Sequence, residues 1–411
     1  MLIGNAVVGQ SGGPTSAINA TLKGVIAAAE AAREDGFIKA LYGMRNGIEG
    51  FLEERLCDLF EEFKEPRDLD DLAVTPSAAL GSCRRRLNPH TDDPETYRQI
   101  FSLFEKYDIR YFFYIGGNDS MDTVWKLSSY AEEFGHEIRF IGVPKTIDND
   151  LVGTDHTPGF GSAAKFVATT VKELLRDINV YTARAVTIVE IMGRDAGWLT
   201  SAAALPLLSG GVGPDLVYLP ERVFSRERFL ADLERKLSEH PAVLVAVSEG
   251  VRLADGSYVG EAAQSGSTDA FGHRYLSGVG KALELLVKEK LGCKVRSLAL
   301  SLPQRAAAHL ASLTDLTEAE QVGAAAVRLA TEGHTGVMAA LVRSEGDYAV
   351  TVVPRPVGEV ANKIRTVPDA FLNAEGNGVT DACLSYLLPL ILGEVPVRYE
   401  NGMPRHYVIG E

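Results

Sequence analysis

The sequence predicts an α/β protein made of two parallel-sheet domains packed together. The chain has 411 residues, which is long for a single hydrophobic core. Short apolar runs alternate with segments of helical length, as βαβ units require. Polar loops that contain glycine follow several of the predicted strands. Because ligands bind at the carboxyl ends of parallel strands, we expect these loops to form one site.

Each predicted strand is a short run rich in β-branched or aromatic residues, and most are followed by a turn signal and a helical pattern. The predicted strands occupy residues 6–9, 37–42, 111–115, 139–143, 185–191, 242–247 and 295–300. The predicted helices occupy residues 16–32, 94–107, 119–134, 195–205, 224–239 and 275–291. Right-handed crossovers between such strands place the loops that follow them along one sheet edge.

Composition limits the classes of partner. Hydrophobic residues make up 46% of the chain and charged residues 23%, as in ordinary soluble globular proteins. The net charge of −14 argues against nucleic acid or an anionic membrane as a partner. A phosphorylated substrate stays compatible with this charge, because local arginines can bind it.

The cysteines and the N-terminus favour a cytoplasmic protein. The four cysteines lack metal or disulfide spacing, and they are Cys57, Cys83, Cys293 and Cys383. Structural zinc and a disulfide framework are therefore not expected, and a reducing compartment fits. Residues 1–5 lack the basic region of a signal peptide. The apolar residues 384–392 are too few to span a membrane and are interrupted by Pro389, so we expect a core segment.

The loop at residues 144–150 carries the most chemistry. It follows a predicted buried strand and contains Lys145, Thr146, Asp148 and Asp150. A lysine can neutralise a phosphoryl group in transfer, and a carboxylate can accept a proton or hold a metal. This combination indicates phosphoryl transfer to a hydroxyl group.

Four further loops share this character, at residues 10–16, 116–120, 192–197 and 248–250. Adjacent glycines such as Gly12 and Gly13 let backbone amides approach a phosphate at a helix N-terminus. One such loop is most simply explained as an ordinary turn, but five at successive strand ends indicate a shared site. Neither the P-loop pattern nor a Gly-x-Gly-x-x-Gly pattern after a strand occurs.

These loops resemble, in order, those of the phosphofructokinase family, in which a sugar phosphate receives a second phosphoryl group. The similarity extends to about residue 306 and is carried by Ser11-Gly12-Gly13 through Asn19, Leu80-Gly81-Ser82-Cys83-Arg84, residues 116–120, Thr146-Ile147-Asp148-Asn149-Asp150, Met192-Gly193-Arg194, Glu249-Gly250, Arg296 and Gln304-Arg305. The resemblance implies two Rossmann-like parallel-sheet domains with the active site in the cleft between them. It also implies a place in glycolysis or gluconeogenesis.

The resemblance implies the following roles. Asp148 is the proton acceptor for the attacking hydroxyl, and Arg194 stabilises the transition state. The donor is bound by Gly12, Gly13, Arg84 and Gly117. Fructose 6-phosphate is bound by Thr146, Ile147, Asp148, Met192, Gly193, Arg194, Glu249, Arg296, Gln304 and Arg305. Mg²⁺ is held by Asn118 and Asp150, although Asn118 replaces the usual aspartate.

Two residues indicate which donor is used. ATP-using members of the family tend to have glycine at the positions of Asp119 and Lys145. Asp119 places a carboxylate where the α-phosphate of a nucleotide would lie, which like-charge repulsion and the bulk of the side chain both oppose. Lys145 reaches towards the phosphoryl group in transfer. This pair resembles the branch of the family that uses inorganic pyrophosphate (diphosphate).

The resemblance also predicts the domains and the assembly. Residues 1–145 with part of the C-terminal region are expected to bind the donor, and residues 146–310 the sugar phosphate. Residues 311–411 are expected to form an extension packed on both. Since one phosphate-binding arginine of the family comes from a neighbouring subunit, we expect a homodimer or homotetramer.

Several alternatives stay open. The chain could use ATP, or it could be a non-catalytic regulatory paralogue, for which Asn118 is the only support. Arg85 and Arg86 are interpreted as a solvated basic run. Glu249 could cap a helix and Arg305 could lie on the surface. The histidines show no metal spacing and are interpreted as structural or exposed.

Overall fold

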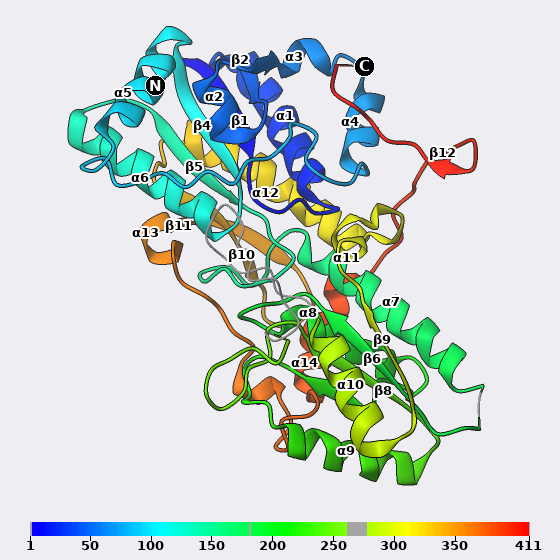
Figure 1. Ribbon diagram of the computed structural model, residues 1–411. Helices are drawn as coiled ribbons and strands as arrows, with labels where there is room; N and C mark the ends of the chain where they lie inside the picture. The colour runs from blue at the N-terminus through cyan, green and yellow to red at the C-terminus, as the bar shows by residue number, and fades with distance from the viewer. Residues whose placement is uncertain (1, 181, 261–277, 411) are drawn as a thin grey trace.

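Two largely parallel sheets organise the computed structural model, which describes residues 2–180, 182–260 and 278–410 (Figure 1). The larger sheet has the order β11-β10-β5-β4-β1-β2-β3, and the smaller has the order β7-β8-β6-β9. All neighbours are parallel except the β10–β11 and β2–β3 pairs. The predicted α/β class with two sheets is therefore confirmed.

The elements have the following bounds. The strands of the larger sheet are β1 Gly4–Gln10, β2 Ile38–Met44, β3 Leu56–Asp58, β4 Ile109–Gly116, β5 Arg139–Pro144, β10 Val337–Arg343 and β11 Val350–Pro356. Those of the smaller sheet are β6 Ala185–Ile191, β7 Leu216–Tyr218, β8 Ala242–Ser248 and β9 Lys294–Ala299. A short hairpin is formed by β12 Tyr399–Glu400 and β13 Met403–Pro404. The α-helices are α1 Ile18–Glu34, α2 Gly47–Leu52, α3 Leu59–Glu62, α4 Pro66–Ala73, α5 Pro94–Lys106, α6 Asn118–Phe134, α7 Phe160–Ile178, α8 Trp198–Ser201, α9 Arg226–Glu239, α10 Val279–Leu291, α11 Pro303–Ala306, α12 Leu313–Thr331, α13 Val357–Val360 and α14 Asp381–Leu387.

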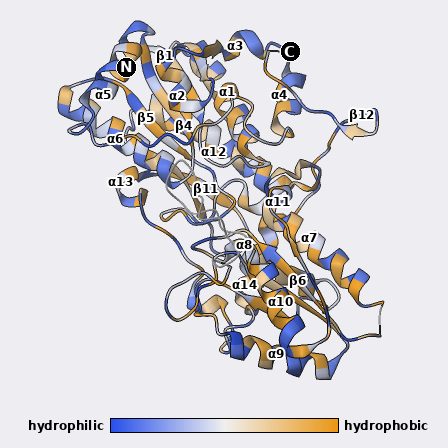
Figure 2. Ribbon diagram, viewed as in Figure 1, coloured by the Kyte–Doolittle hydropathy of each residue, from blue (hydrophilic) through white to orange (hydrophobic). Residues whose placement is uncertain are grey.

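Alternation along the strands fills a core on each face of the larger sheet. Tyr111 and Phe113 of β4 point to the face covered by α1 and α12, whereas Phe112 and Tyr114 point to the face covered by α5 and α6. Figure 2 shows the hydrophobic residues concentrated along the strands. The helices α1 and α12 approach closely, because a Cβ atom on Gly24 would lie 2.0 Å from the backbone oxygen of Glu320. Burial on both faces explains why these strands are nearly continuous apolar runs.

All seven predicted strands are present, but two helix predictions differ. The helix predicted at residues 195–205 begins at Trp198 and continues as a 3₁₀-helix over Ala202–Leu208, within which Pro206 lacks the backbone N–H that an α-helix needs. The first residues of the helix predicted at 275–291 lie outside the described residues, and α10 begins at Val279. The C-terminal segments 384–387 and 388–391 are short helical turns with Leu384 and Leu390 buried.

The region after residue 311 returns to the larger sheet. Strand β10 pairs in parallel with β5, where Val337 lies opposite Ile141, and β11 pairs with β10. Tyr407 near the C-terminus donates its backbone N–H to the Thr75 hydroxyl oxygen at 2.8 Å. The domain boundaries at residues 145 and 310 stay a prediction. Within the described ranges, none of the helices has the length and apolarity needed to cross a membrane.

Candidate active site

A cavity of about 420 Å³ lies where loops from both sheets meet. The larger sheet contributes the loops after β1, β4 and β5, and the smaller sheet those after β6 and β8. Its lining includes Gly12, Gly13, Arg84, Gly117, Asn118, Asp119, Lys145, Thr146, Ile147, Asp148, Asp150, Met192, Arg194, Glu249 and Arg305. The five loops singled out in the sequence therefore converge on one cavity, as expected for a parallel-sheet edge.

Lys145 is a buried residue that lines this cavity. It directly follows β5, and its side chain is only 2% exposed. Its Nζ donates to the Gly13 backbone oxygen at 2.6 Å. Burial lowers the Lys145 pKa to about 7, with Asp148 opposing this effect and Arg305 adding to it. The ammonium group is held directly beside the glycine turn of the first loop.

Two carboxylates follow Lys145 in the same loop. Burial raises the pKa of Asp148, although the charges of Arg194 and Lys145 oppose the rise. Burial also raises the pKa of Asp150 to about 7, and the negative charge of Asp148 adds to the increase. Partly buried carboxylates that share a cavity with cations are typical of sites that move protons or hold metals.

The segment after this loop fixes its conformation. Thr157 donates its hydroxyl to the Thr146 backbone oxygen at 2.8 Å and its backbone N–H to the Asn149 side-chain oxygen at 3.1 Å. Asn149 adopts the left-handed conformation, with φ of 55°. The backbone N–H of Asp148 donates to the Thr146 hydroxyl oxygen at 3.1 Å. These bonds hold Asp148 in a tight turn.

Arg365, from the C-terminal region, also holds this loop. Its backbone N–H donates to the Asp150 backbone oxygen at 2.7 Å. Its guanidinium donates to the Thr154 backbone oxygen at 2.9 Å and to the Tyr386 hydroxyl at 3.1 Å. The same group lies 4.4 Å from the centroid of the Trp198 ring, as a cation–π contact requires. One arginine thus connects the loops that follow β5 and β6.

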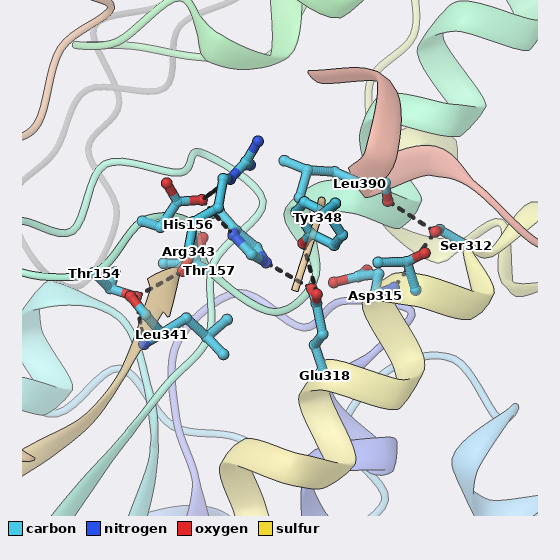
Figure 3. Close-up of polar contacts among 12 residues, drawn as sticks. Thr154, His156, Thr157, Ser312, Asp315, Glu318, Leu341, Arg343, Tyr348 and Leu390 are labelled. Atoms are coloured by element: carbon cyan, nitrogen blue, oxygen red, sulfur yellow. Dashed lines mark hydrogen bonds and ion pairs between the residues drawn. The ribbon is translucent and has the colours of Figure 1, made fainter. Parts of the chain in front are cut away.

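A largely buried charged cluster connects segment 154–157 to α12 and to residues 343–348 (Figure 3). His156 is 1% exposed; its Nδ1 lies 2.8 Å from Asp155 and its Nε2 lies 2.7 Å from Glu318 on α12. Tyr348 donates its hydroxyl to Glu318 at 2.6 Å, and Arg343 donates to Asp155 at 3.0 Å. Burial alone would lower the His156 pKa, but the hydrogen bonds with the two carboxylates outweigh it and raise the pKa.

We expect His156→Ala to destabilise the fold by about 3–5 kcal/mol near pH 6, because it leaves the buried Glu318 carboxylate without its cation and removes one of the two cations that pair with Asp155. Since the folded-state pKa of His156 is raised, its contribution is complete below the unfolded pKa of about 6.5 and disappears as pH rises through the folded pKa. Urea unfolding near pH 6 and near pH 9 measures this dependence. The exposed His334→Ala is the control, with an expected change within about 0.5 kcal/mol. An equal loss from His156→Ala at both pH values would contradict the assignment.

The loop after β1 brings its glycine backbone close to two arginine side chains. Gly12 adopts φ of 76°, which favours glycine, and its N–H donates to the Cys83 backbone oxygen at 3.1 Å. A Cβ atom on Gly13 would lie 3.1 Å from Nη1 of Arg305 and 4.0 Å from Nη2 of Arg84. Burial lowers the pKa of Arg305, and the positive charge of Arg84 adds to this effect. Two guanidinium groups beside a glycine turn form a site suited to a phosphate.

The loops of the smaller sheet line the other side of the cavity. Burial raises the Glu249 pKa to about 8, and its Oε1 accepts the Gly193 backbone N–H at 3.3 Å. The Gln304 side-chain oxygen accepts the Met192 backbone N–H at 3.3 Å. Nε of Arg194 is buried and has no hydrogen-bond partner among the described residues. An unsatisfied guanidinium N–H in a cavity is suited to an incoming anion.

Some predicted site residues lie outside the cavity lining. Gly193 and Gln304 support the lining residue Met192 and its neighbours from behind. Arg296 is exposed on β9, an edge strand of the smaller sheet, and does not line the cavity. Its predicted contact with the sugar phosphate stays a prediction.

The predicted metal ligands have different surroundings. Asp150 faces the cavity with a partly buried carboxyl group. The Asn118 side chain is engaged by backbone at both ends, because its oxygen accepts the Asn362 N–H at 2.7 Å and its amide donates to the Lys363 oxygen at 2.6 Å. No group of three or more His, Cys, Asp or Glu side chains with metal-binding geometry occurs in the described part of the chain. The magnesium role of Asn118 stays a prediction, and its observed contacts fasten the C-terminal segment.

Eight residues that line the cavity had no role assigned from the sequence, and they are Ser11, Pro14, Arg86, Ser120, Asp195, Ala196, Asn362 and Ile364. Arg86, interpreted as solvated, pairs with Asp119 at 3.2 Å. Asp195 follows Arg194 directly and pairs with Arg252 at 2.8 Å. Asn362 and Ile364 come from beyond the region of resemblance, so no local motif marked them. Asp195 lies in the loop at residues 192–197 that the sequence singled out, and Arg86 lies two residues after the assigned Arg84, so these positions were the available signals.

The fold and the cavity define the class of protein: an α/β phosphotransferase with its site between two parallel sheets. The chain belongs to the phosphofructokinase family, whose model, described as Phosphofructokinase, matches residues 5–330. It is 43% identical to a pyrophosphate--fructose 6-phosphate 1-phosphotransferase of Halomonas elongata, over 98% of this chain and 95% of that protein. It is 42% identical to the protein of that name from Xanthomonas campestris pv. campestris, over 99% and 96%. A solved structure of a pyrophosphate-dependent phosphofructokinase from Nitrosospira multiformis matches with a TM-score of 0.88 and 37% identity, covering 98% of this chain and 96% of that one.

Proposed function

We propose that this protein is a pyrophosphate-dependent 6-phosphofructokinase. It transfers a phosphoryl group reversibly from diphosphate to the 1-hydroxyl of D-fructose 6-phosphate, giving fructose 1,6-bisphosphate and phosphate in glycolysis or gluconeogenesis. The observation that carries this proposal is the pair Lys145 and Asp119, both of which line the cavity. The names of relatives that are 40–43% identical support the same donor.

Asp148 removes the proton from the sugar hydroxyl as that oxygen attacks the donor. Its raised pKa makes it a stronger base than an exposed aspartate, while Arg194 and Lys145 favour its ionised form. Phosphoryl transfer requires mainly in-line positioning and charge neutralisation. Lys145, Arg194 and Arg84 supply positive charge at the transferring group, and Gly12, Gly13 and Gly117 let the donor approach the backbone.

The sugar phosphate is held mainly by the loops of the smaller sheet. Glu249 binds sugar hydroxyls, and Arg305 binds the 6-phosphate. Thr146, Ile147, Met192 and Gly193 shape the pocket around the sugar, and Gln304 holds the Met192 backbone in place.

Magnesium fits the residues present. The partly buried Asp150 carboxyl, with a pKa raised to about 7 by desolvation and by Asp148, would gain from a cation in the cavity. Mg²⁺ is typically held by one or two carboxylates together with substrate phosphates, so diphosphate oxygens and water would complete the shell that Asp150 begins. When bound, the ion neutralises charge on the diphosphate.

The active form is a homodimer or homotetramer in the cytoplasm. Arg296 is exposed on an edge strand, outside the cavity of its own chain. An arginine in this position is suited to binding the 6-phosphate in the site of a second copy.

Initial rates with fructose 6-phosphate and either diphosphate or ATP test the proposal. We expect turnover with diphosphate and at most trace activity with ATP. Appreciable ATP activity with none from diphosphate would instead establish an ATP-dependent kinase. Absence of turnover with either donor would favour a non-catalytic paralogue.

A further inference from the structure

Arg86, Asp119 and Asn362 form a cluster at the donor side of the cavity, here called the donor clasp. Nη2 of Arg86 lies 3.2 Å from the Asp119 carboxylate and donates to the Asn362 side-chain oxygen, also at 3.2 Å. All three residues line the cavity. They come from three segments of chain: the loop before α5, the start of α6 and the segment after α13.

The clasp is held from behind by α6. Asn118 binds the backbone of Asn362 and Lys363 through both ends of its amide. Asp122, 2% exposed, accepts the Asn362 side-chain amide at 2.9 Å. Lys126, which pairs with Asp122, donates to the Leu87 backbone oxygen at 2.8 Å and so fixes the loop that carries Arg86.

The donor clasp pairs a carboxylate that would otherwise repel the donor. Diphosphate carries several negative charges, and Asp119 places a further one on the wall of the same cavity. An unpaired carboxylate there would oppose the donor as well as a nucleotide, since Coulomb repulsion acts on both. Arg86 is the cation that pairs with Asp119, and Asn362 fixes the direction of its guanidinium.

We propose that Arg86 is a positioning residue that pins and neutralises Asp119, so that the cavity accepts diphosphate despite that carboxylate. This inference rests on the proposed function. Arg86 acts through Asp119, and Asn362 acts through Arg86. If Arg86 contacted the donor directly, binding would need Arg86 whether or not residue 119 is charged. If Arg86 acts through Asp119, removing the charge of Asp119 removes the need for Arg86.

A double-mutant cycle with inorganic diphosphate as the probe tests this proposal. The variants are Arg86→Ala, Asp119→Asn and the two combined, with Arg85→Ala as the matched control because Arg85 does not line the cavity. Calorimetry gives the Kd of diphosphate, and initial rates give KM and kcat. We expect Arg86→Ala to weaken diphosphate binding about tenfold, or about 1.4 kcal/mol, mainly through KM. Asn362→Gly, which suits the left-handed backbone at φ of 62°, should produce a smaller loss in the same direction.

The decisive comparison is the effect of Arg86→Ala with and without the charge of Asp119. In the Asp119→Asn background, Arg86→Ala should change the Kd less than about twofold, because a coupled pair is non-additive. An equal tenfold loss in both backgrounds would overturn the proposal, as would an unchanged Kd in Arg86→Ala. If the wild-type chain uses ATP and not diphosphate, the proposed function fails and this inference fails with it. If the wild-type chain uses diphosphate and rescue is absent, only this inference fails.

Discussion

Asp148→Asn is expected to lower kcat about 10³-fold, within the 10²- to 10⁴-fold range that a positioned general base contributes. The variant keeps the size of the side chain and its place in the turn, where the backbone N–H donates to Thr146. It removes the basic oxygen that accepts the hydroxyl proton. Initial rates in both directions measure the effect, because microscopic reversibility makes the same group an acid in the reverse reaction.

The binding of fructose 6-phosphate separates a chemical effect from a structural one. We expect the Kd of fructose 6-phosphate to change less than about threefold, or about 0.6 kcal/mol, since Glu249 and Arg305 stay in place. Asp347→Asn, in an exposed loop, is the matched control and should leave kcat unchanged. A kcat for Asp148→Asn within tenfold of wild type would remove Asp148 from the role of base.

Local patterns were sufficient to predict the sheets and the loops that meet at the cavity. Strands such as β4 are apolar on both faces and are followed by turn residues, so their positions follow from hydrophobicity and turn chemistry. Because the sheets are parallel, the loops after their strands must meet, which explains why Gly12, Lys145 and Arg194 share one cavity.

The remaining part of the site depends on contacts that no local pattern records. Asn362 reaches the cavity from more than 200 residues beyond Asn118, and the two are joined only through tertiary hydrogen bonds. Arg86 is exposed, as its place in a basic run predicts, but its guanidinium also pairs with Asp119, which no local pattern records. Asn118 has the residue type of a metal ligand, but its amide binds backbone at both ends. The residue types indicated which contacts these side chains can make, and the tertiary structure determines which contacts they do make.

Lys145→Met is expected to lower kcat/KM for diphosphate about 10²- to 10³-fold, in the range observed when one preorganised charge stabiliser is removed. Its ammonium is buried beside Gly13 and is the cation that directly follows the strand carrying the catalytic loop. Lys64→Met, at an exposed lysine, is the control and should have no effect.

The pH dependence of kcat/KM tests the role of the Lys145 charge more specifically than the loss of rate does. Because burial lowers the Lys145 pKa to about 7, its charge is present below that pH and is lost above it, so kcat/KM for diphosphate should fall on the alkaline side. On the acid side it should fall as Asp148, whose pKa is raised, becomes protonated. Lys145→Arg keeps its charge at every accessible pH, so it should abolish the alkaline decrease while leaving the acid one. An alkaline decrease that persists in Lys145→Arg would show that another group, such as Glu249 with its pKa raised to about 8 by burial, titrates there, and the decrease could then not be assigned to Lys145.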